Sequence, residues 1–150
     1  MSTTQPELGE ATFTRIYDAP AALVFECMTT PEHLTHFWGP TGVCTPLGNI
    51  VVELRPGGRF ETIMVNDETG DEYPSRGVFV EIDPPHRLVW TEPDVEGGMT
   101  TASTFTDLGD GRCRVDIHQT NVPMMFLSPE AQAGMESSFD RFVAYLKTIV

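Results

Sequence analysis

The sequence predicts one α+β domain in which a curved antiparallel sheet of about seven strands wraps around a long C-terminal helix. Two short helices are expected after the first strand. Three observations predict this fold class: alternating stretches with short turns in the middle, a helical apolar stripe at the end, and a length that fits one domain. The 150 residues are 40% hydrophobic and contain no repeat or linker. We therefore expect a flexible tail over residues 1–10 and a single domain over residues 11–150.

The first predicted elements are a strand and two short helices. Residues 12–17 combine β-branched and aromatic side chains with alternation, which is typical of a strand. Pro20 suits a first helical position, and apolar residues follow it at helical spacing: Leu23, Val24, Cys27 and Met28. Thr30 as N-cap and Pro31 at the first position predict a second short helix, which Gly39 and Pro40 end.

The middle of the chain predicts an antiparallel meander. Strands are expected over residues 50–54, 59–65, 75–82, 87–91, 100–106 and 113–120. Short polar turns separate them, such as Arg55-Pro56-Gly57-Gly58, which supplies a fixed φ and then residues free to take a positive φ. Parallel strands would need crossovers of about a dozen residues or more, so antiparallel pairing is favoured.

The C-terminal segment changes to a helical period. Ser128 is the expected N-cap, with Pro129 at the first helical position and Glu130 near the positive end of the helix dipole. Apolar residues then recur at steps of three and four: Met135, Phe139, Phe142, Val143, Leu146 and Ile149 or Val150. This stripe spans about six turns and requires a sheet to cover it.

Composition excludes several classes of function. The net charge of −13 describes a surface that repels phosphates, so we expect no nucleic-acid partner and no membrane partner. The chain lacks an apolar run of roughly 20 residues and a signal-peptide pattern, which favours the cytoplasm. Cys27, Cys44 and Cys113 are expected as buried small side chains, because their spacing suits neither a disulfide framework nor a zinc site.

Several short motifs occur in a specific order along the chain. They are Asp18-Ala19-Pro20, Pro31-Glu32-His33-Leu34, Trp38-Gly39-Pro40, Leu54-Arg55-Pro56-Gly57-Gly58-Arg59-Phe60 and Leu88-Val89-Trp90-Thr91-Glu92. Together they resemble the heat-shock-protein-90 ATPase activator homologue family of the SRPBCC (START and birch-pollen-allergen) superfamily, over nearly the whole chain. The resemblance implies the helix-grip fold, with a ligand cavity between the sheet and the C-terminal helix. It also implies a chaperone as a candidate partner and a link to the stress response.

The sequence departs from this family at three points, one of which is Glu53, where the usual D-L-R-P-G-G motif carries Asp and the charge is kept. The family's C-terminal helix usually carries Gly-Trp before an S-L-D-R-L segment, whereas here Gly134-Met135 precedes Ser138-Phe139-Asp140-Arg141-Phe142. Loss of the large indole should widen or reshape the cavity. The chain also lacks the second, N-terminal domain of the eukaryotic co-chaperones, so we do not expect it to activate a chaperone.

The chain is rich in aromatic and methionine residues that would ordinarily form the core. If the fold is of the helix-grip type, part of this core is expected to be the wall of a cavity. Flexible methionine suits a wall that accommodates several apolar shapes. Phe60, Thr62 and Met64 share one strand face, and Phe139 faces the sheet from the helix. The residues predicted to bind the ligand are Trp38, Phe60, Thr62, Met64, Phe79, Trp90, Met135 and Phe139.

The histidines give no firm catalytic or metal site. His33 and His36 lack further ligands at zinc spacing and are expected at an exposed helix end, and His86 is expected in an exposed turn. His118 shares a strand face with Asp116, and this pair would act as a general base only if it faced the cavity. Nearby arginines favour the solvent side for both.

Two strand carboxylates are further candidates. Glu61 and Glu81 would have raised pKa values if they pointed inward, but the wet face of the sheet is favoured for each. Arg76 and Arg15 are their expected ion-pair partners. No nucleotide-binding, nucleophile-elbow or zinc-protease motif is present, so no cofactor, metal or catalytic residue is predicted.

The leading hypothesis is a binding protein that holds a small apolar or amphipathic ligand, as a monomer or homodimer. Two alternatives stay open. One is a cyclase- or hydrolase-like enzyme that uses a cavity carboxylate or His118. The other is a protein that docks on a chaperone ATPase through its surface. The sequence favours binding over catalysis, since it contains no recognisable catalytic motif.

Overall fold

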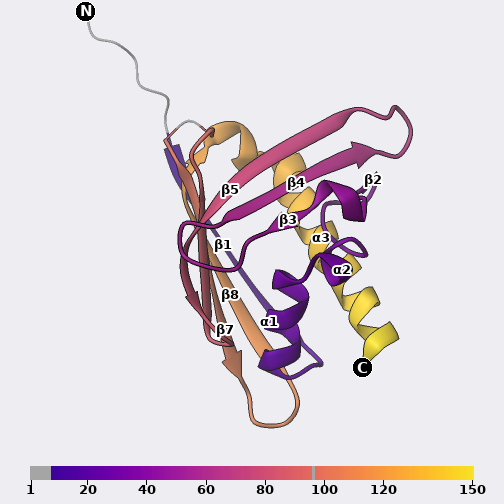
Figure 1. The fold of residues 1–150 in the computed structure, drawn as a ribbon, viewed down its shortest axis with the longest axis vertical. Coiled ribbons are helices and arrows are strands. Elements are labelled where there is room, and N and C mark those ends of the chain that lie inside the picture. The colour runs from indigo at the N-terminus through magenta and orange to yellow at the C-terminus, as the bar shows by residue number, and fades with distance from the viewer. Residues whose placement is uncertain (1–7, 96) are drawn as a thin grey trace, which may run out of the picture.

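The computed structural model describes residues 8–95 and 97–150 (Figure 1). The strands are β1 (Leu8–Tyr17), β2 (Val43–Cys44), β3 (Val51–Val52), β4 (Arg59–Asn66), β5 (Glu72–Asp83), β6 (Arg87–Glu92), β7 (Met99–Asp107) and β8 (Cys113–Pro123). The helices are α1 (Ala21–Thr29), α2 (Pro31–Leu34) and α3 (Pro129–Ile149), with short 3-10 turns η1 (Leu47–Asn49) and η2 (Met124–Leu127). The predicted α+β fold class is confirmed: two short helices follow the first strand and one long helix ends the chain.

All strands form one antiparallel sheet in the order β1-β8-β7-β6-β5-β4-β2, with β3 also paired to β4. The strands from β4 to β8 follow one another as a meander, and β1 pairs with β8 and forms the edge strand on that side. The sheet curves around α3, and α1 packs on β7 and β8 (Figure 1). This arrangement is the helix-grip layout expected from the sequence.

The strand bounds differ from the prediction mainly at the ends of the sheet. β1 begins at Leu8, so residues 8–10 are paired strand and not tail, and the rest of the predicted tail lies outside the described residues. The strand expected over residues 50–54 is only β3, because the chain turns where Glu53 accepts from Arg59 and donates back to it. The sheet also contains β2, which the sequence pattern did not indicate, so the described residues form eight strands where about seven were expected.

The helix starts match their sequence signals closely. Ser128 caps α3, since its Oγ accepts a hydrogen bond of 3.2 Å from the backbone N–H of Ala131. Pro20 lies one residue before α1, where its carbonyl accepts the first helical hydrogen bonds from Leu23 and Val24. No helix in the described part of the chain is long and apolar enough to cross a membrane.

The core lies where α1, α3 and the loop after α2 meet the sheet. Phe142 of α3 is 1% exposed and packs edge-on against Tyr17 of β1, with 4.8 Å between ring centroids. Its ring also lies 4.4 Å from that of Phe37. Cys27 and Cys113 are buried, and burial raises the pKa of each thiol to about 11. Cys44 is exposed, so the prediction of burial was wrong for this cysteine.

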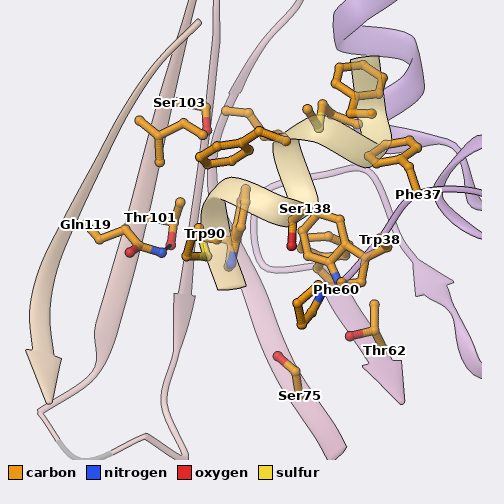
Figure 2. Close-up of a pocket in the computed structure, with 18 of the residues that line it drawn as sticks. Phe37, Trp38, Phe60, Thr62, Ser75, Trp90, Thr101, Ser103, Gln119 and Ser138 are labelled. Atoms are coloured by element: carbon orange, nitrogen blue, oxygen red, sulfur yellow. Dashed lines mark hydrogen bonds between the residues drawn. The ribbon is translucent and has the colours of Figure 1, made fainter. Parts of the chain in front are cut away.

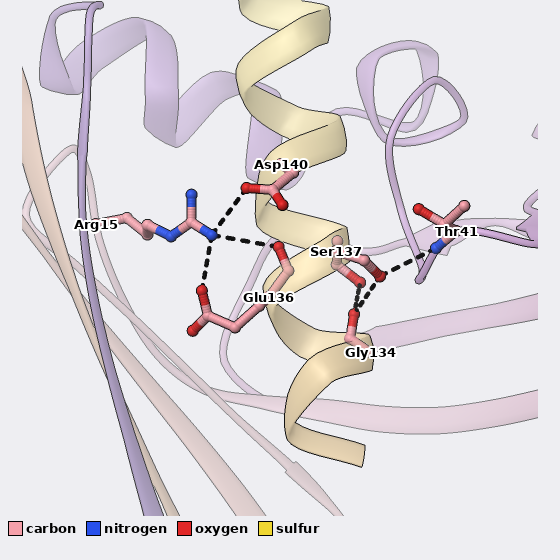
Figure 3. Close-up of polar contacts among 7 residues, drawn as sticks. Arg15, Thr41, Gly134, Glu136, Ser137 and Asp140 are labelled. Carbon is pink, nitrogen blue, oxygen red and sulfur yellow. Dashed lines mark hydrogen bonds and ion pairs between the residues drawn. The ribbon is translucent and has the colours of Figure 1, made fainter. Parts of the chain in front are cut away.

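Polar contacts on two sides of α3 hold it to β1 and to the neighbouring loop (Figure 3). The guanidinium of Arg15 in β1 donates to Glu136 Oε2 at 2.7 Å and to Asp140 Oδ1 at 3.0 Å. The same guanidinium lies 5.4 Å from the centroid of the Phe139 ring. On the other side of α3, Ser137 Oγ accepts from the backbone N–H of Thr41 at 3.1 Å. These contacts fix which face of α3 points to the sheet.

Candidate functional site

A cavity of about 380 Å³ lies between α3 and the inner face of β4 to β8. Because side chains alternate along a strand, every second residue of these strands points into it. β4 contributes Phe60, Thr62 and Met64 in this way, and β6 contributes Trp90 and Glu92. Further lining residues come from β5, β7, β8, α3 and the loop between α2 and β2, together with Met28 of α1 and Phe126 of η2. Figure 2 shows side chains from these elements converging on one space.

The wall near β4 and β6 is aromatic. The Trp38 ring packs edge-on to Phe60 at 5.4 Å, and Phe60 packs perpendicular to Trp90 at 5.0 Å (Figure 2). Gly77 lies opposite Phe60 in β5, and a Cβ there would come within 3.3 Å of the Trp90 ring. A glycine at this position therefore lets the indole lie close against the sheet.

The loop that carries Trp38 is held to α3 by one arginine. Arg141 Nη1 lies 2.8–3.4 Å from the carbonyl oxygens of Trp38, Gly39, Pro40 and Val43. Charged donors make the stronger hydrogen bonds in proteins, so this cluster fixes the loop as a rigid wall. Arg141 belongs to the helix segment that matched the family's S-L-D-R-L pattern.

The same loop approaches β4 closely through a glycine. Gly39 has a φ of +100°, and a Cβ there would lie 2.8 Å from the sulfur of Met64. The backbone conformation is strained for any residue other than glycine, and a Cβ would also displace the flexible Met64 side chain. The Trp38-Gly39-Pro40 motif thus shapes the cavity; the sequence analysis predicted Trp38 as a ligand-binding residue and Gly39-Pro40 as a helix end.

The helix side of the cavity is formed by one face of α3. Met135, Ser138 and Phe139 line it, at steps of three and one residues. Phe139 is also packed edge-on against Phe13 of β1, with centroids 5.3 Å apart. Met135 is partly buried and adjoins the same small cluster. The family's indole position is therefore part of the cavity wall here and carries a thioether.

Polar side chains occupy part of the sheet face between the aromatic residues. They are Thr62, Ser75, Glu92, Thr101, Ser103 and Gln119 (all but Glu92 are labelled in Figure 2). Gln119 Nε2 donates to Thr101 Oγ1 at 3.3 Å. Ser75 Oγ donates to Glu92 Oε1 at 2.8 Å. The cavity is thus apolar with a set of hydrogen-bonding groups on one wall, as ligand sites commonly are.

Glu92 is the titratable group of this site. Burial raises the pKa of its carboxyl above the ordinary 4.5, and the hydrogen bond from Ser75 lowers it by less. Among the described residues that line the cavity, no other side chain is ionisable near neutral pH. No group of three or more His, Cys, Asp or Glu residues in ranges 8–95 and 97–150 is arranged to hold a metal ion.

Seven of the eight residues predicted to bind a ligand line the cavity; they are Trp38, Phe60, Thr62, Met64, Trp90, Met135 and Phe139. Phe79 does not. Its side chain is 1% exposed and stacks on Phe60 at 5.3 Å, so it belongs to the core behind the cavity wall. The sequence placed Phe79 in the aromatic set but gave no information on how deep it lies.

The candidate acid–base residues lie away from the cavity. His118 is exposed and pairs with Glu10 at 2.5 Å, while Asp116 accepts from Arg114 and Thr14. His118 and Asp116 therefore do not form the pair that general-base chemistry would need. Their predicted solvent-facing position is confirmed.

The strand carboxylates are also outside the cavity. Glu61 lies 3.8 Å from Arg59, and Glu81 lies 3.1 Å from Arg87. The expected partners Arg76 and Arg15 were wrong, because Arg15 binds the carboxylates of α3.

The helix-end histidines contact one tyrosine of α3. His33 Nδ1 lies 2.6 Å from Tyr145 Oη, and the His36 ring stacks on Tyr145 at 4.9 Å. His33 is half-buried, so the expectation of exposure was wrong for it, whereas His36 and His86 are exposed as predicted.

Sequence reasoning missed Glu92, the one carboxylate among the described residues that line the cavity. The signal was present in Trp90-Thr91-Glu92: a residue two positions after a cavity tryptophan shares its strand face. Its nearness to the polar segment after β6 made it resemble a strand-end residue, and its partner Ser75 is distant in sequence.

Comparison with known proteins places the chain in a family. Solved structures with the same fold include a Nitrosomonas europaea protein (TM-score 0.81, 23% identity, covering 93% of this chain and 94% of that one). The AHSA1 protein of Silicibacter pomeroyi has a TM-score of 0.78 and 19% identity, over 95% of this chain and all of that one. An AHSA1-like protein of Aeromonas hydrophila has a TM-score of 0.79 and 18% identity, over 94% of each chain.

At these identities the solved structures establish the fold alone, and a comparison with curated proteins finds no match. The family model described as "Activator of Hsp90 ATPase homolog 1-like protein" matches residues 18–147, which is most of the sequence. The chain therefore belongs to the Activator of Hsp90 ATPase homolog 1-like family.

Proposed function

We propose that this protein binds a small amphipathic molecule in the cavity between its sheet and α3. The observation that carries the proposal is a single space of about 380 Å³ with a mainly apolar wall and a few convergent polar groups. Ligand pockets usually measure about 300–1,000 Å³, so the size suits a small ligand. The apolar wall would supply affinity, and the polar groups would fix orientation.

The wall combines rigid and adaptable parts. Trp38, Phe60 and Trp90 hold one another in edge-on contacts, which supports a fixed surface for a flat or compact apolar group. Met64 and Met135 lie at other parts of the wall and can change rotamer at low cost. This combination supports recognition of a ligand class by shape, with tolerance for variation at one side.

An acid–base enzyme is a second candidate, and Glu92 is the observation that favours it. A half-buried carboxylate with a raised pKa in an apolar cavity is a common feature of active sites. General acid–base catalysis on most substrates also needs a second polar or nucleophilic group. Ser75 is hydrogen-bonded to Glu92, and these two residues would be the only candidates for such a pair. The other described lining residues include no second acid or base. Binding is therefore the better-supported function.

The binding proposal is tested by filling the cavity from the helix. Met135→Trp places an indole where the family usually carries one, in space that a ligand would otherwise occupy. We expect weaker binding of the neutral apolar dye Nile red, together with an unchanged or higher melting temperature, because a buried aromatic adds apolar contact if it fits without strain. Fluorescence titration measures the affinity, and thermal melts measure the stability.

The matched control is Ala133→Trp, on an exposed position of the same helix. This variant should bind the dye as the unmodified protein does. Equal affinity of the Met135→Trp and unmodified proteins would show that the dye binds elsewhere, and absence of binding by either would contradict the proposed function. A chaperone partner is a separate proposal, which a pull-down with a chaperone ATPase tests.

A further inference from the structure

The charge distribution of the cavity is one-sided. Glu92 is the only acidic residue of the described lining, and no lysine, arginine or histidine lies among these residues. Ser75 donates to one carboxylate oxygen, Oε1, and Oε2 makes no hydrogen bond with the residues the structure describes. A bound molecule therefore meets one hydrogen-bond acceptor of negative charge and no positive group.

An anionic head group is poorly suited to this site. A carboxylate or phosphate placed in the cavity would have no cationic side chain to pair with, and it would be repelled by Glu92. The whole chain adds to this effect, because its net charge of −13 repels anions and attracts cations over long range. Fatty acids and other carboxylates are thus disfavoured as ligands.

A cationic head group satisfies the same site. An ammonium at Glu92 would form a charge-assisted hydrogen bond in a partly desolvated setting, where such bonds are strong. The aromatic faces help as well: Trp90 shares the strand face of Glu92 and packs against Phe60. Indole and phenyl faces attract cations and also pack against apolar bodies.

We propose that the cavity selects amphipathic amines, with the ammonium group at Glu92 and Ser75 and the apolar body against Trp38, Phe60 and Trp90. This inference rests on the proposed binding function and names the ligand class for the same cavity. Ser75 is a positioning residue, because its hydrogen bond holds one oxygen of Glu92 and leaves the other for the ligand.

Three probes with one apolar body test the inference: 1-naphthylmethylamine, 1-naphthylmethanol and 1-naphthoic acid. They carry a cationic, a neutral and an anionic head group. Isothermal titration calorimetry gives the affinity of each for the unmodified protein, for Glu92→Gln, and for Glu68→Gln as a control at an exposed turn. Glu92→Gln keeps the size of the side chain and removes its charge.

We expect the amine to bind roughly tenfold or more tightly than the alcohol, and the acid to bind most weakly. Glu92→Gln should abolish the preference, so that amine and alcohol bind within about twofold of each other, while Glu68→Gln should keep the preference of the unmodified protein. Equal binding of amine and alcohol, or a preference that survives Glu92→Gln, would overturn the amine inference and leave the binding function intact. Failure of all three probes to bind would overturn the binding function itself.

Discussion

Truncation of Phe142 tests whether α3 is docked as described. Phe142→Ala removes a ring that is 1% exposed and packs between Tyr17 and Phe37, at 4.8 and 4.4 Å. The loss combines the transfer free energy of the ring with the cavity left behind, and Phe→Ala changes of this kind cost about 3–5 kcal/mol. Two aromatic contacts are lost at once, so we expect the free energy of unfolding to fall within that range.

Urea unfolding followed by circular dichroism measures this free energy. For a domain of this size, a loss of about 3–5 kcal/mol corresponds to a decrease in melting temperature of roughly 10 °C. Lys147→Ala, at an exposed position of the same helix, should change the free energy of unfolding by less than about 0.5 kcal/mol. A loss below about 1 kcal/mol for Phe142→Ala would refute the packing of α3 on the sheet.

Two further predictions concern the loop wall and the cavity carboxylate. Arg141→Ala should cost about 1.5–3 kcal/mol in urea unfolding, because carbonyls of the loop at Trp38 lose a charged donor, whereas the exposed Arg112→Ala should cost less than about 1 kcal/mol. Equal losses in the free energy of unfolding for the two arginine variants would contradict the role of Arg141 in holding this loop. Glu92→Gln should raise the melting temperature of the ligand-free protein at neutral pH and have little effect below pH 4.5. The reason is that a raised folded-state pKa contributes stability at low pH, which is lost as the pH rises through that pKa. A difference between the two proteins that does not change with pH would contradict this.

Local patterns predicted most of the fold. The stripe from Met135 to Leu146 and the cap at Ser128 define α3 within the sequence itself, and the turns between strands fix their antiparallel order. What local patterns could not give is pairing between distant residues. Arg15 was expected beside strand carboxylates, but its partners lie on α3, more than 120 residues away. The short β2 depends in the same way on pairing with β4.

The candidate site followed the same rule. Alternation grouped Phe60, Thr62 and Met64 on one face of β4 but did not tell which face is concave; in the structure this face lines the cavity. It could not separate wall from core, which is why Phe79 was assigned to the wall although it lies behind Phe60. Glu92 was missed although its strand face follows from that of Trp90, because its hydrogen bond with Ser75, 17 residues away in the sequence, cannot be read from the neighbouring residues.

The methionines provide the most direct measurement of the central claim that the cavity is the binding site. Met28, Met64, Met99 and Met135 line it, whereas Met124 and Met125 lie outside it and are 51% and 72% exposed. Carbon-13 labelling of the methionine methyl groups therefore allows one NMR titration with 1-naphthylmethanol to report on both sets. We predict chemical-shift changes at the four cavity methyl groups and none at Met124 and Met125. Shifts confined to Met124 and Met125, with the cavity methyl groups unchanged, would contradict the account.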